Sequence, residues 1–477
     1  MKGLVRRLTW LVVGVVVAVV AVLVVDHVRS HRDPSQVAIP GEVPELPTGP
    51  PFTPGSIDAP YVAGISDNGR YFVDQNGDPF LVRGDSPWSM LADLRPEEFD
   101  GYWGDRAARG FNAAIVSLIG DGGNGGTWDG ATADGILPFL GGDPGRVSTP
   151  NPDYLARAHD LVESAGEFGI TVFLYPVDGW VVGHAFRPES TDECAGWGRV
   201  VAQTFADLPN IVWGFGGDYV SQDPPTDTDR CFDAVRVGLR AEGDTRPVSI
   251  QFMSPLTWST QNEYWSSRVD WNFVYSYAPT FQGVREAWAT EPPRPVLLGE
   301  SNYEGLNLQP DSPPTTNESL RRQVAWALTS GAAGDFYGSQ DWEFRPGWQD
   351  RIDRPGQAQV NTIRDVFERL PWWTLRPADD QEILLGGPPA GDDPNRDVLE
   401  DDHPTVAVTD DGALAVAYLP AAMTVSVEGD FTDARWVDPS TGDEHLVDPS
   451  WRDTRTLTTP GGNADDGEDW LLILSHT

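Results

Sequence analysis

The stretch PVLLGESNYE, residues 295–304, decides the fold prediction because it places an acid at the end of a buried strand. Its apolar run at residues 296–298 leads through a glycine to Glu300. A second stretch, IVWGFGGD at residues 211–218, has the same form and ends on Asp218. Continuous apolar runs are typical of parallel strands that are covered on both faces. The two stretches therefore predict a parallel sheet that carries two carboxylates at the ends of its strands.

Strand and helix patterns alternate on both sides of these stretches. About eight apolar runs read as strands, at residues 80–85, 113–119, 170–177, 211–218, 247–252, 273–277, 295–300 and 335–339. Helical spacing of apolar residues separates most of them, at residues 96–109, 152–168, 192–207, 230–242, 282–290, 317–330 and 357–370. No Gly-rich nucleotide fingerprint follows the first strand, where the sequence is GDSPW. The number of units favours a (β/α)8 TIM barrel, of class α/β, over an open doubly wound sheet.

The N-terminal residues 1–32 predict a cytoplasmic N-terminus and a transmembrane anchor. Lys2, Arg6 and Arg7 precede an apolar run at residues 8–25, which has about the minimum length of a membrane span. No Ala-x-Ala cleavage pattern follows the run, so an uncleaved anchor is favoured over a signal peptide and secretion. The basic residues in front of the run predict that the body of the chain lies outside the cell membrane.

Three further segments follow the anchor. Residues 33–60 are rich in proline and are predicted to form a semi-extended linker that holds the body away from the membrane. Residues 61–375 are assigned to the barrel, and a hairpin at residues 69–82 with an Asn-Gly turn opens them. Residues 376–477 contain short alternating segments separated by turns, a pattern that is typical of a small all-β sandwich.

The composition excludes one class of partner. The formal net charge is −39, from 72 acidic and 33 basic residues, whereas nucleic-acid binding depends on basic patches. We therefore expect no nucleic-acid partner and interpret the acidic surface as a device for solubility. The chain also has 19 tryptophans, whose rings pack in cores and also stack on sugar rings.

The two cysteines, Cys194 and Cys231, leave three readings open: a disulfide, part of a metal site, or two unrelated residues. A zinc site needs further ligands at short spacing, and the sequence has none. Export of the chain favours a disulfide, and neighbouring barrel helices would bring the two residues together. Since no His, Cys and carboxylate cluster with metal-ligand spacing is present, we expect no metal and no cofactor.

The candidate active site follows from the barrel, because barrel enzymes place their sites at the C-terminal ends of the strands. Glycosidic bond cleavage needs one carboxylic acid to protonate the leaving oxygen and a second carboxylate to attack the anomeric carbon or activate water. Strands four and seven face each other across an eight-stranded barrel, so we predict Asp218 as the proton donor and Glu300 as the nucleophile. The competing interpretation is that each acid caps a helix or forms an ion pair.

The remaining strand ends supply carboxylates, amides and aromatic rings as candidates for substrate binding: Asp85, Trp88, Asp178, Trp180, Tyr219, Gln251, Tyr277, Tyr303, Glu304, Gln340 and Trp342. Asp85 stays open between binding a substrate hydroxyl and making a structural hydrogen bond. Glu304 is expected to support the site rather than react.

Four motifs resemble those of the apiosidase-like glycoside hydrolases, glycoside hydrolase family 140. They are GDSPWSML at residues 84–91, RAARGFN at 106–112, WGFGGD at 213–218 and LLGESNYEG at 297–305. The resemblance implies an acid/base role for Asp218, a nucleophilic role for Glu300, and activity on apiose in pectic side chains. ARWVDPSTGD at residues 434–443 is similar to the β-sandwich that often follows this catalytic domain. That sandwich is sometimes labelled collagen-binding, and we do not take the label to imply collagen binding here.

The leading hypothesis is a membrane-anchored, extracytoplasmic glycosidase that acts on a pentofuranose-containing polysaccharide or oligosaccharide of the apiose or arabinose type. Retention of anomeric configuration follows if the two carboxyl groups lie roughly 5–5.5 Å apart. The alternative is a non-catalytic glycan-binding or wall-associated protein on a degenerate barrel, against which the intact pair of acids argues. An esterase or metallopeptidase is disfavoured, because the nucleophile-elbow context and the metal motifs are missing.

Overall fold

A computed structural model describes residues 37–120, 126–143, 145–306, 314–391, 393 and 396–476. The predicted transmembrane run at residues 8–25 lies outside the described residues. Among the helices that are described, none combines the length and the apolar character needed to cross a bilayer.

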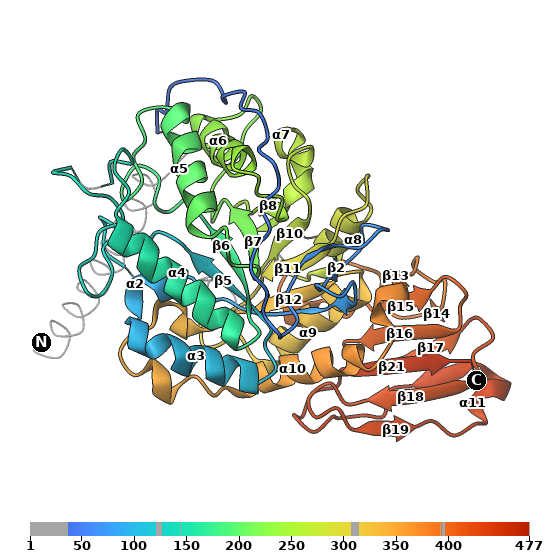
Figure 1. The fold of residues 1–477 in the computed structure, drawn as a ribbon. Helices are drawn as coiled ribbons and strands as arrows, with labels where there is room; N and C mark the ends of the chain where they lie inside the picture. The colour runs from blue at the N-terminus through green and yellow to red at the C-terminus, as the bar shows by residue number, and fades with distance from the viewer. Residues whose placement is uncertain are drawn as a thin grey trace, which may run out of the picture.

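The largest sheet of the described chain has nine strands and curls around a central core (Figure 1). Its order is β8-β7-β6-β5-β4-β12-β11-β10-β9. Every neighbouring pair is parallel except β9 and β10. The bounds are β4 (Val82–Asp85), β5 (Ala113–Ser117), β6 (Thr171–Tyr175), β7 (Ile211–Phe215), β8 (Val248–Ile250), β9 (Leu256–Trp258), β10 (Asn272–Ser276), β11 (Val296–Glu300) and β12 (Gly334–Tyr337).

Helices lie outside the curled sheet and follow its strands in the predicted alternation (Figure 1). Three of them begin with proline at the first turn, where its missing N–H costs no hydrogen bond, and others begin with a Ser or Thr cap. The bounds are α2 (Met90–Asp93), α3 (Pro96–Ala108), α4 (Pro152–Glu167), α5 (Thr191–Thr204), α6 (Asp227–Ala241), α7 (Glu263–Ser266), α8 (Phe281–Trp288), α9 (Asn317–Thr329) and α10 (Pro355–Glu368).

The closed ring predicted from the sequence is interrupted between β8 and β10, which form no ladder among the described residues. Serine side chains bridge this seam instead. The Ser259 hydroxyl donates to the Ile250 carbonyl at 2.7 Å and accepts from the Phe273 N–H at 2.8 Å. The Ser249 hydroxyl donates to the Trp271 carbonyl at 2.6 Å. The sheet is therefore a TIM-like barrel with one seam that side chains close.

A small sheet packs against the base of the barrel, opposite the carboxyl ends of the strands. It contains β1 (Gly64–Ile65), β2 (Phe72–Val73) and β3 (Pro79–Phe80), so the predicted hairpin is present with one additional strand. Phe72 is fully buried, and its ring meets the rings of Phe173 and Trp271 edge to face. The apolar side chain of Phe72 thus fills the lower end of the barrel core.

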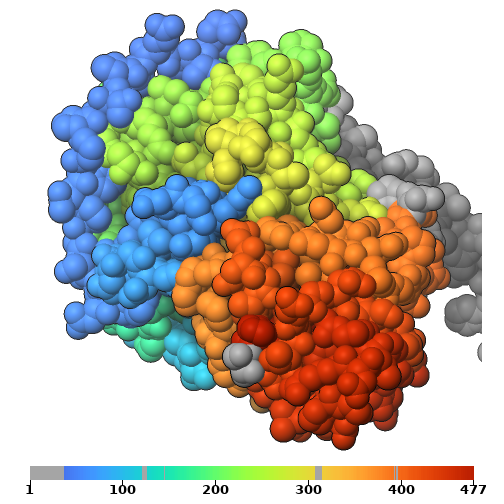
Figure 2. All heavy atoms as spheres, turned by 90° about the vertical axis from the view of Figure 1, so that its right-hand side faces the viewer, coloured from blue at the N-terminus to red at the C-terminus, as the bar shows by residue number. Residues whose placement is uncertain are grey.

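Residues 37–60, here called the N-terminal strap, differ from the predicted free linker. The strap lies on the outside of α5 and α6 and runs down one edge of the molecule (Figures 1 and 2). Ile39 is fully buried, and its N–H donates to Asp227 at the start of α6. Further along, the Gly49 N–H donates to the Arg240 carbonyl at 3.0 Å, near the end of the same helix. These contacts fasten the described part of the segment to the barrel.

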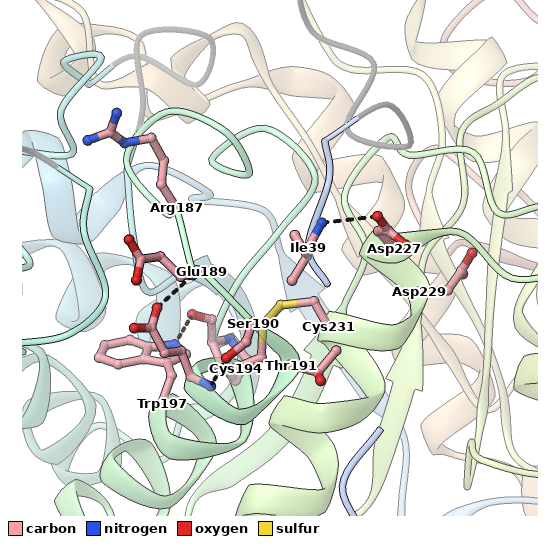
Figure 3. The surroundings of a disulfide bond; sticks show 12 residues. Ile39, Arg187, Glu189, Ser190, Thr191, Cys194, Trp197, Asp227, Asp229 and Cys231 are labelled. Atoms are coloured by element: carbon pink, nitrogen blue, oxygen red, sulfur yellow. Dashed lines mark hydrogen bonds between the residues drawn. A yellow bond between two sulfur atoms is a disulfide. The ribbon is translucent and has the colours of Figure 1, made fainter. Parts of the chain in front are cut away.

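A disulfide joins Cys194 of α5 to Cys231 of α6, with the two Cα atoms 5.4 Å apart (Figure 3). Both sulfur atoms are buried beside Ile39 of the strap. The pairing expected for an exported chain is thus present. It links the two helices that the strap covers, and both described cysteines are used in it.

The C-terminal residues form two antiparallel sheets that pack on each other with their own apolar core. The larger has the order β13-β15-β16-β21-β18-β19, and the smaller β14-β17-β20. The bounds are β13 (Leu375–Pro377), β14 (Leu384–Leu385), β15 (Thr405–Thr409), β16 (Leu414–Leu419), β17 (Thr424–Val427), β18 (Asp433–Val437), β19 (Glu444–Leu446), β20 (Thr456–Thr458) and β21 (Trp470–Ser475).

The larger sheet of this sandwich is covered on both faces. Ala415 and Ala417 of β16 point to the sandwich core, whereas Val416 and Tyr418 point to the barrel. Helix α9 covers this second face through a fully buried ion pair, in which Arg321 donates to both carboxylate oxygens of Asp469 at 2.7 and 2.9 Å. The sandwich is therefore packed directly against the barrel (Figure 1).

Candidate active site

A sharp turn after β7 presents Asp218 at the carboxyl end of the sheet. Gly216, Gly217 and Asp218 have φ angles of 95°, 80° and 54°, all in the left-handed region. Aspartate tolerates this region better than most non-glycine residues, and such backbone strain is concentrated at functional sites. A side chain at Gly216 would place its Cβ only 1.9 Å from the Gln251 carbonyl oxygen. The two glycines therefore let the chain turn closely against the end of β8.

Glu300 ends β11 and is 7% exposed. Two neutral donors hold its carboxylate. The Tyr277 hydroxyl donates to Oε1 at 3.0 Å, and the Gln251 side-chain amide donates to Oε2 at 2.8 Å. Gln251 follows β8 and Tyr277 follows β10, so the two donors come from opposite sides of the seam between these strands.

Tyr275 and Gln251 connect the two acids. Tyr275 pairs with Glu300 in the register of β10 and β11, and its hydroxyl lies 2.6 Å from that of Tyr277. Tyr275 and Gln251 also lie close enough to the Asp218 carboxyl group to lower its pKa. Asp218 and Glu300 thus share two polar neighbours, which brings the two acids into one small site.

Burial dominates the electrostatics of both acids. It raises the pKa of Glu300 to about 8, with a further rise from the charge of Asp218, while hydrogen bonds from Tyr277, Tyr275 and Gln251 act in the opposite direction. Burial also raises the pKa of Asp218 to about 6, opposed by Tyr275 and Gln251. Two like charges at close range disfavour double ionisation, so the pair holds one proton near neutral pH.

Two polar atoms in this site are buried without a hydrogen-bond partner among the described residues. They are Asp218 Oδ1 and Gln251 Oε1. Buried polar atoms are normally satisfied, and an exception needs an explanation. Both atoms are therefore placed to bind the polar groups of a ligand.

Aromatic side chains form one wall beside Glu300. The Trp88 indole donates to the Tyr303 hydroxyl at 2.7 Å, and its ring meets the Tyr175 ring edge to face at 5.0 Å. Burial and the charge of Glu300 raise the pKa of Tyr303 and of Tyr175. Both phenols are therefore neutral donors or acceptors at physiological pH.

The structure assigns structural contacts to four of the predicted binding residues. Asp85 accepts from the Tyr102 hydroxyl at 2.6 Å and pairs with Arg106, which resolves its open role towards a structural hydrogen bond. The Tyr219 ring is fully buried, and its hydroxyl donates to Asp229 of α6 at 2.9 Å.

Glu304 and Asp178 likewise hold backbone in place. Glu304 accepts from the Gly356 and Gln357 N–H groups at the start of α10, so it supports the fold rather than binding substrate. Asp178 accepts from the Ser117 hydroxyl and from the Trp180 N–H, which fixes the turn after β6.

Three predicted residues lie on the rim and are half-buried. Trp180 is in the turn after β6, and Gln340 and Trp342 lie in the short helix η3 (Gln340–Glu343) after β12. The Trp342 carbonyl accepts from the Ser89 hydroxyl at 2.7 Å, which ties this helix to the segment after β4. These positions agree with the substrate contacts expected of the three residues, which stay a prediction.

Two site residues were missed, Tyr275 and Tyr175. Tyr275 precedes Tyr277 by two positions in the strand that the sequence predicts at residues 273–277, and the strand period of two would have placed both rings on the same face. Tyr175 gives no such signal in the sequence. Its ring crosses the neighbouring strand, where a Cβ at Gly214 would lie 2.2 Å from it.

One group of the described residues could hold a metal ion. It consists of His159, Asp160 and Glu163 on the outer face of α4, where His159 already contacts Asp207. The group is distant in the fold from the strand ends that carry Asp218 and Glu300.

A TIM-like barrel with two buried carboxylates at the ends of its fourth and seventh parallel strands has the arrangement that glycosidic bond cleavage requires, which is that of the glycoside hydrolase class. The family comparison gives the particular family. The model "Apiosidase-like, catalytic domain" matches residues 66–374, and the chain belongs to this family. The chain is therefore a glycosidase.

Solved structures agree on the fold. One described as a glycoside hydrolase is 18% identical, with a TM-score of 0.71, and the match covers 90% of this chain and 99% of the other. A glycoside hydrolase family 5 structure from Bacteroides vulgatus is 19% identical, with a TM-score of 0.70 and coverage of 87% and 93%. The search of curated proteins finds no match.

Proposed function

We propose that this glycosidase is a membrane-anchored, extracytoplasmic enzyme that cleaves a pentofuranose-containing glycan of the apiose or arabinose type with retention of configuration. Asp218 is the acid/base and Glu300 is the nucleophile. The observation that carries the assignment of these two roles is the asymmetry of hydrogen bonding around the two acids.

The asymmetry assigns the two roles. Glu300 receives donors on both carboxylate oxygens, an arrangement that stabilises the ionised form and aims the group. Asp218 keeps its Oδ1 atom without a partner among the described residues, as a proton donor to a leaving group requires. The order of the two pKa values alone would favour the proton on Glu300. A carboxylate that accepts a hydrogen bond on each oxygen is arranged for attack, which favours Glu300 as the nucleophile.

Retention is supported by the shared neighbours of the pair. Tyr275 and Gln251 contact both acids, which favours the shorter carboxyl separation of roughly 5–5.5 Å that retaining enzymes use. In the first step Glu300 attacks the anomeric carbon while Asp218 protonates the departing oxygen. In the second step Asp218 removes a proton from water, which displaces Glu300 from the sugar.

The sugar class and the location rest on other observations. The apiosidase-like family supports a branched or unbranched pentofuranose, and the wall formed by Trp88, Tyr303 and Tyr175 supplies aromatic surface beside the reacting acids. The basic residues and the apolar run at residues 8–25 support anchoring with the body outside.

Azide rescue tests the roles. Asp218→Gly removes the base that activates water, so azide should attack the Glu300-bound sugar and give a glycosyl azide of retained configuration. Glu300→Gly should instead give a glycosyl azide of inverted configuration with an activated aryl pentofuranoside. Both variants should lose about 10⁴-fold or more in kcat without azide. Exchanged stereochemistry between the variants would reverse the assignment, and inverted products from the parent enzyme would remove the retaining mechanism.

A substrate screen tests the sugar. Aryl apiofuranosides and arabinofuranosides, with pectic and arabinan oligosaccharides, are the compounds to compare. Cleavage of aryl pyranosides in preference to all furanosides would contradict the proposed class.

A further inference from the structure

The N-terminal strap first contacts the barrel at its catalytic rim, the face formed by the loops at the carboxyl ends of the strands. Val37 lies 3.1 Å from the position of a Cβ at Gly183, in the loop after β6. Ile39 and Pro40 then contact Asp227 and Thr191, the first residues of α6 and α5. In a parallel barrel the helices begin where the strands end, so these contacts lie on the face that carries Asp218 and Glu300.

From the rim the strap runs to the base. Gly49 and Phe52 contact the carbonyls of Arg240 and Gly243 at the end of α6, and Gly55 contacts that of Asp207 after α5. The described chain therefore begins at the rim, and the strap contacts the barrel from the rim to the base (Figure 1).

The length of chain outside the structure limits the distance to the bilayer. The apolar run ends at Val25, and only residues 26–36 separate it from Val37. A fully extended chain spans about 3.3–3.6 Å per residue, so Val37 lies at most about 40 Å from the end of the membrane-spanning run. A free linker of residues 33–60 would have allowed a much greater distance.

The exposed apolar side chains give an independent observation. The large exposed hydrophobic residues of the described chain are Trp128, Leu140, Val220, Met253, Trp373 and Leu446. The first four lie in loops that follow β5, β7 and β8, at the rim, and they are 43–50% exposed. Apolar residues gathered on one face of an otherwise acidic protein favour an interface there.

Resting on the membrane anchoring proposed above, we propose that the strap holds the catalytic rim towards the bilayer, and that the substrate is a glycan carried by a membrane-attached molecule. A tethered enzyme meets such glycans at a high effective concentration. The net charge of −39 disfavours adsorption to anionic lipid, so the strap and anchor, rather than surface charge, set the orientation.

Energy transfer in proteoliposomes tests the orientation. The full chain is labelled with a donor at Val220→Cys on the rim or at Leu446→Cys on the sandwich, and the bilayer carries a headgroup acceptor. Transfer should be stronger from the rim label. Insertion of 24 Gly/Ser residues after Arg32 leaves the strap docked, and it should reduce the difference between the labels. Equal or stronger transfer from the sandwich label would overturn the proposal.

Activity gives the second readout. An arabinofuranoside or apiofuranoside with a fluorogenic aglycone is offered in soluble form and attached to a lipid in the same vesicles. The insertion should lower the ratio of lipid-borne to soluble turnover at least several-fold and leave soluble turnover unchanged. An unchanged ratio would contradict the membrane-attached substrate. If neither probe is cleaved, the proposed sugar class fails, while the energy transfer still decides the orientation.

Discussion

At the scale of single residues, Gln251 and the tyrosines Tyr275 and Tyr277 determine how the two acids behave. They are uncharged, so they orient carboxyl groups in a buried place without neutralising them as an arginine would. The result is a pair of acids whose pKa values both lie well above their ordinary range because of burial. Such a pair supplies an acid and a base together near neutral pH.

We expect a bell-shaped pH profile of kcat/KM with its optimum between about pH 6 and pH 8. Below the lower pKa both Asp218 and Glu300 are protonated, so no nucleophile is present. Above the upper pKa both are ionised, so no proton donor is present. The measurement is kcat/KM on an aryl pentofuranoside from pH 4 to pH 10. An optimum near pH 4 would contradict the raised pKa values of Asp218 and Glu300.

Tyr277→Phe should shift the basic limb of this profile to higher pH, because the lost donor no longer favours ionised Glu300, whose pKa of about 8 is the upper one of the pair. A hydrogen bond to a charged group contributes about 1.5–3 kcal/mol, so kcat/KM should fall about ten- to a hundredfold. Tyr219→Phe is the control, since that hydroxyl contacts Asp229 in α6. A profile that only loses height, with an unmoved limb, would show that Tyr277 acts by packing alone.

At the scale of elements, two departures from the predicted pattern shape the site. The β8 and β10 strands do not pair, and serine side chains close the seam between them. The residues that follow these two strands, Gln251 and Tyr277, both reach Glu300. The strap is the second departure. It is rich in proline and was predicted to be a free linker, but it is docked on the barrel.

Ile39→Ala should release the upper part of the strap. Truncating a buried isoleucine to alanine typically costs about 2–4 kcal/mol. Because Ile39 lies beside the disulfide near the described end of the chain, this loss should weaken the local docking of the strap rather than the stability of the whole fold. Faster hydrogen exchange or proteolysis at residues 37–50 would report the release, with turnover of a soluble substrate unchanged. Val43→Ala, at a half-buried position, is the matched control. Unchanged protection in the Ile39 variant would contradict the docking.

At the scale of the whole molecule, α9 unites the barrel and the sandwich. It packs under β10–β12 on one side and presents Arg321, Arg322 and Trp326 to the sandwich on the other. A helix buried on both faces cannot lose either neighbour without exposing a large surface, so we expect the two parts to unfold together.

Arg321→Ala should destabilise the protein by about 3–5 kcal/mol, because it leaves Asp469 buried without its cation. Arg321→Met with Asp469→Leu should recover part of the loss. The control is Arg376→Ala, whose pair with Glu382 is about one-third exposed and should contribute at most about 1 kcal/mol. Urea-induced unfolding gives the comparison. Equal losses for Arg321→Ala and Arg376→Ala would contradict a shared core.

The parallel strands, their order along the chain, the helices between them and the two acids at strand ends could be predicted from the sequence, because these depend on local periodicity and on apolar runs. The sequence also indicated Gln251, Tyr277 and the disulfide partners. The sequence did not show that Asp85, Tyr219 and Glu304 make structural contacts, that Tyr275 and Tyr175 join the site, or that the strap is docked; the folded arrangement did. The physical reason is that a side chain's role depends on which distant donor or acceptor burial brings within hydrogen-bond range, and no local pattern encodes that.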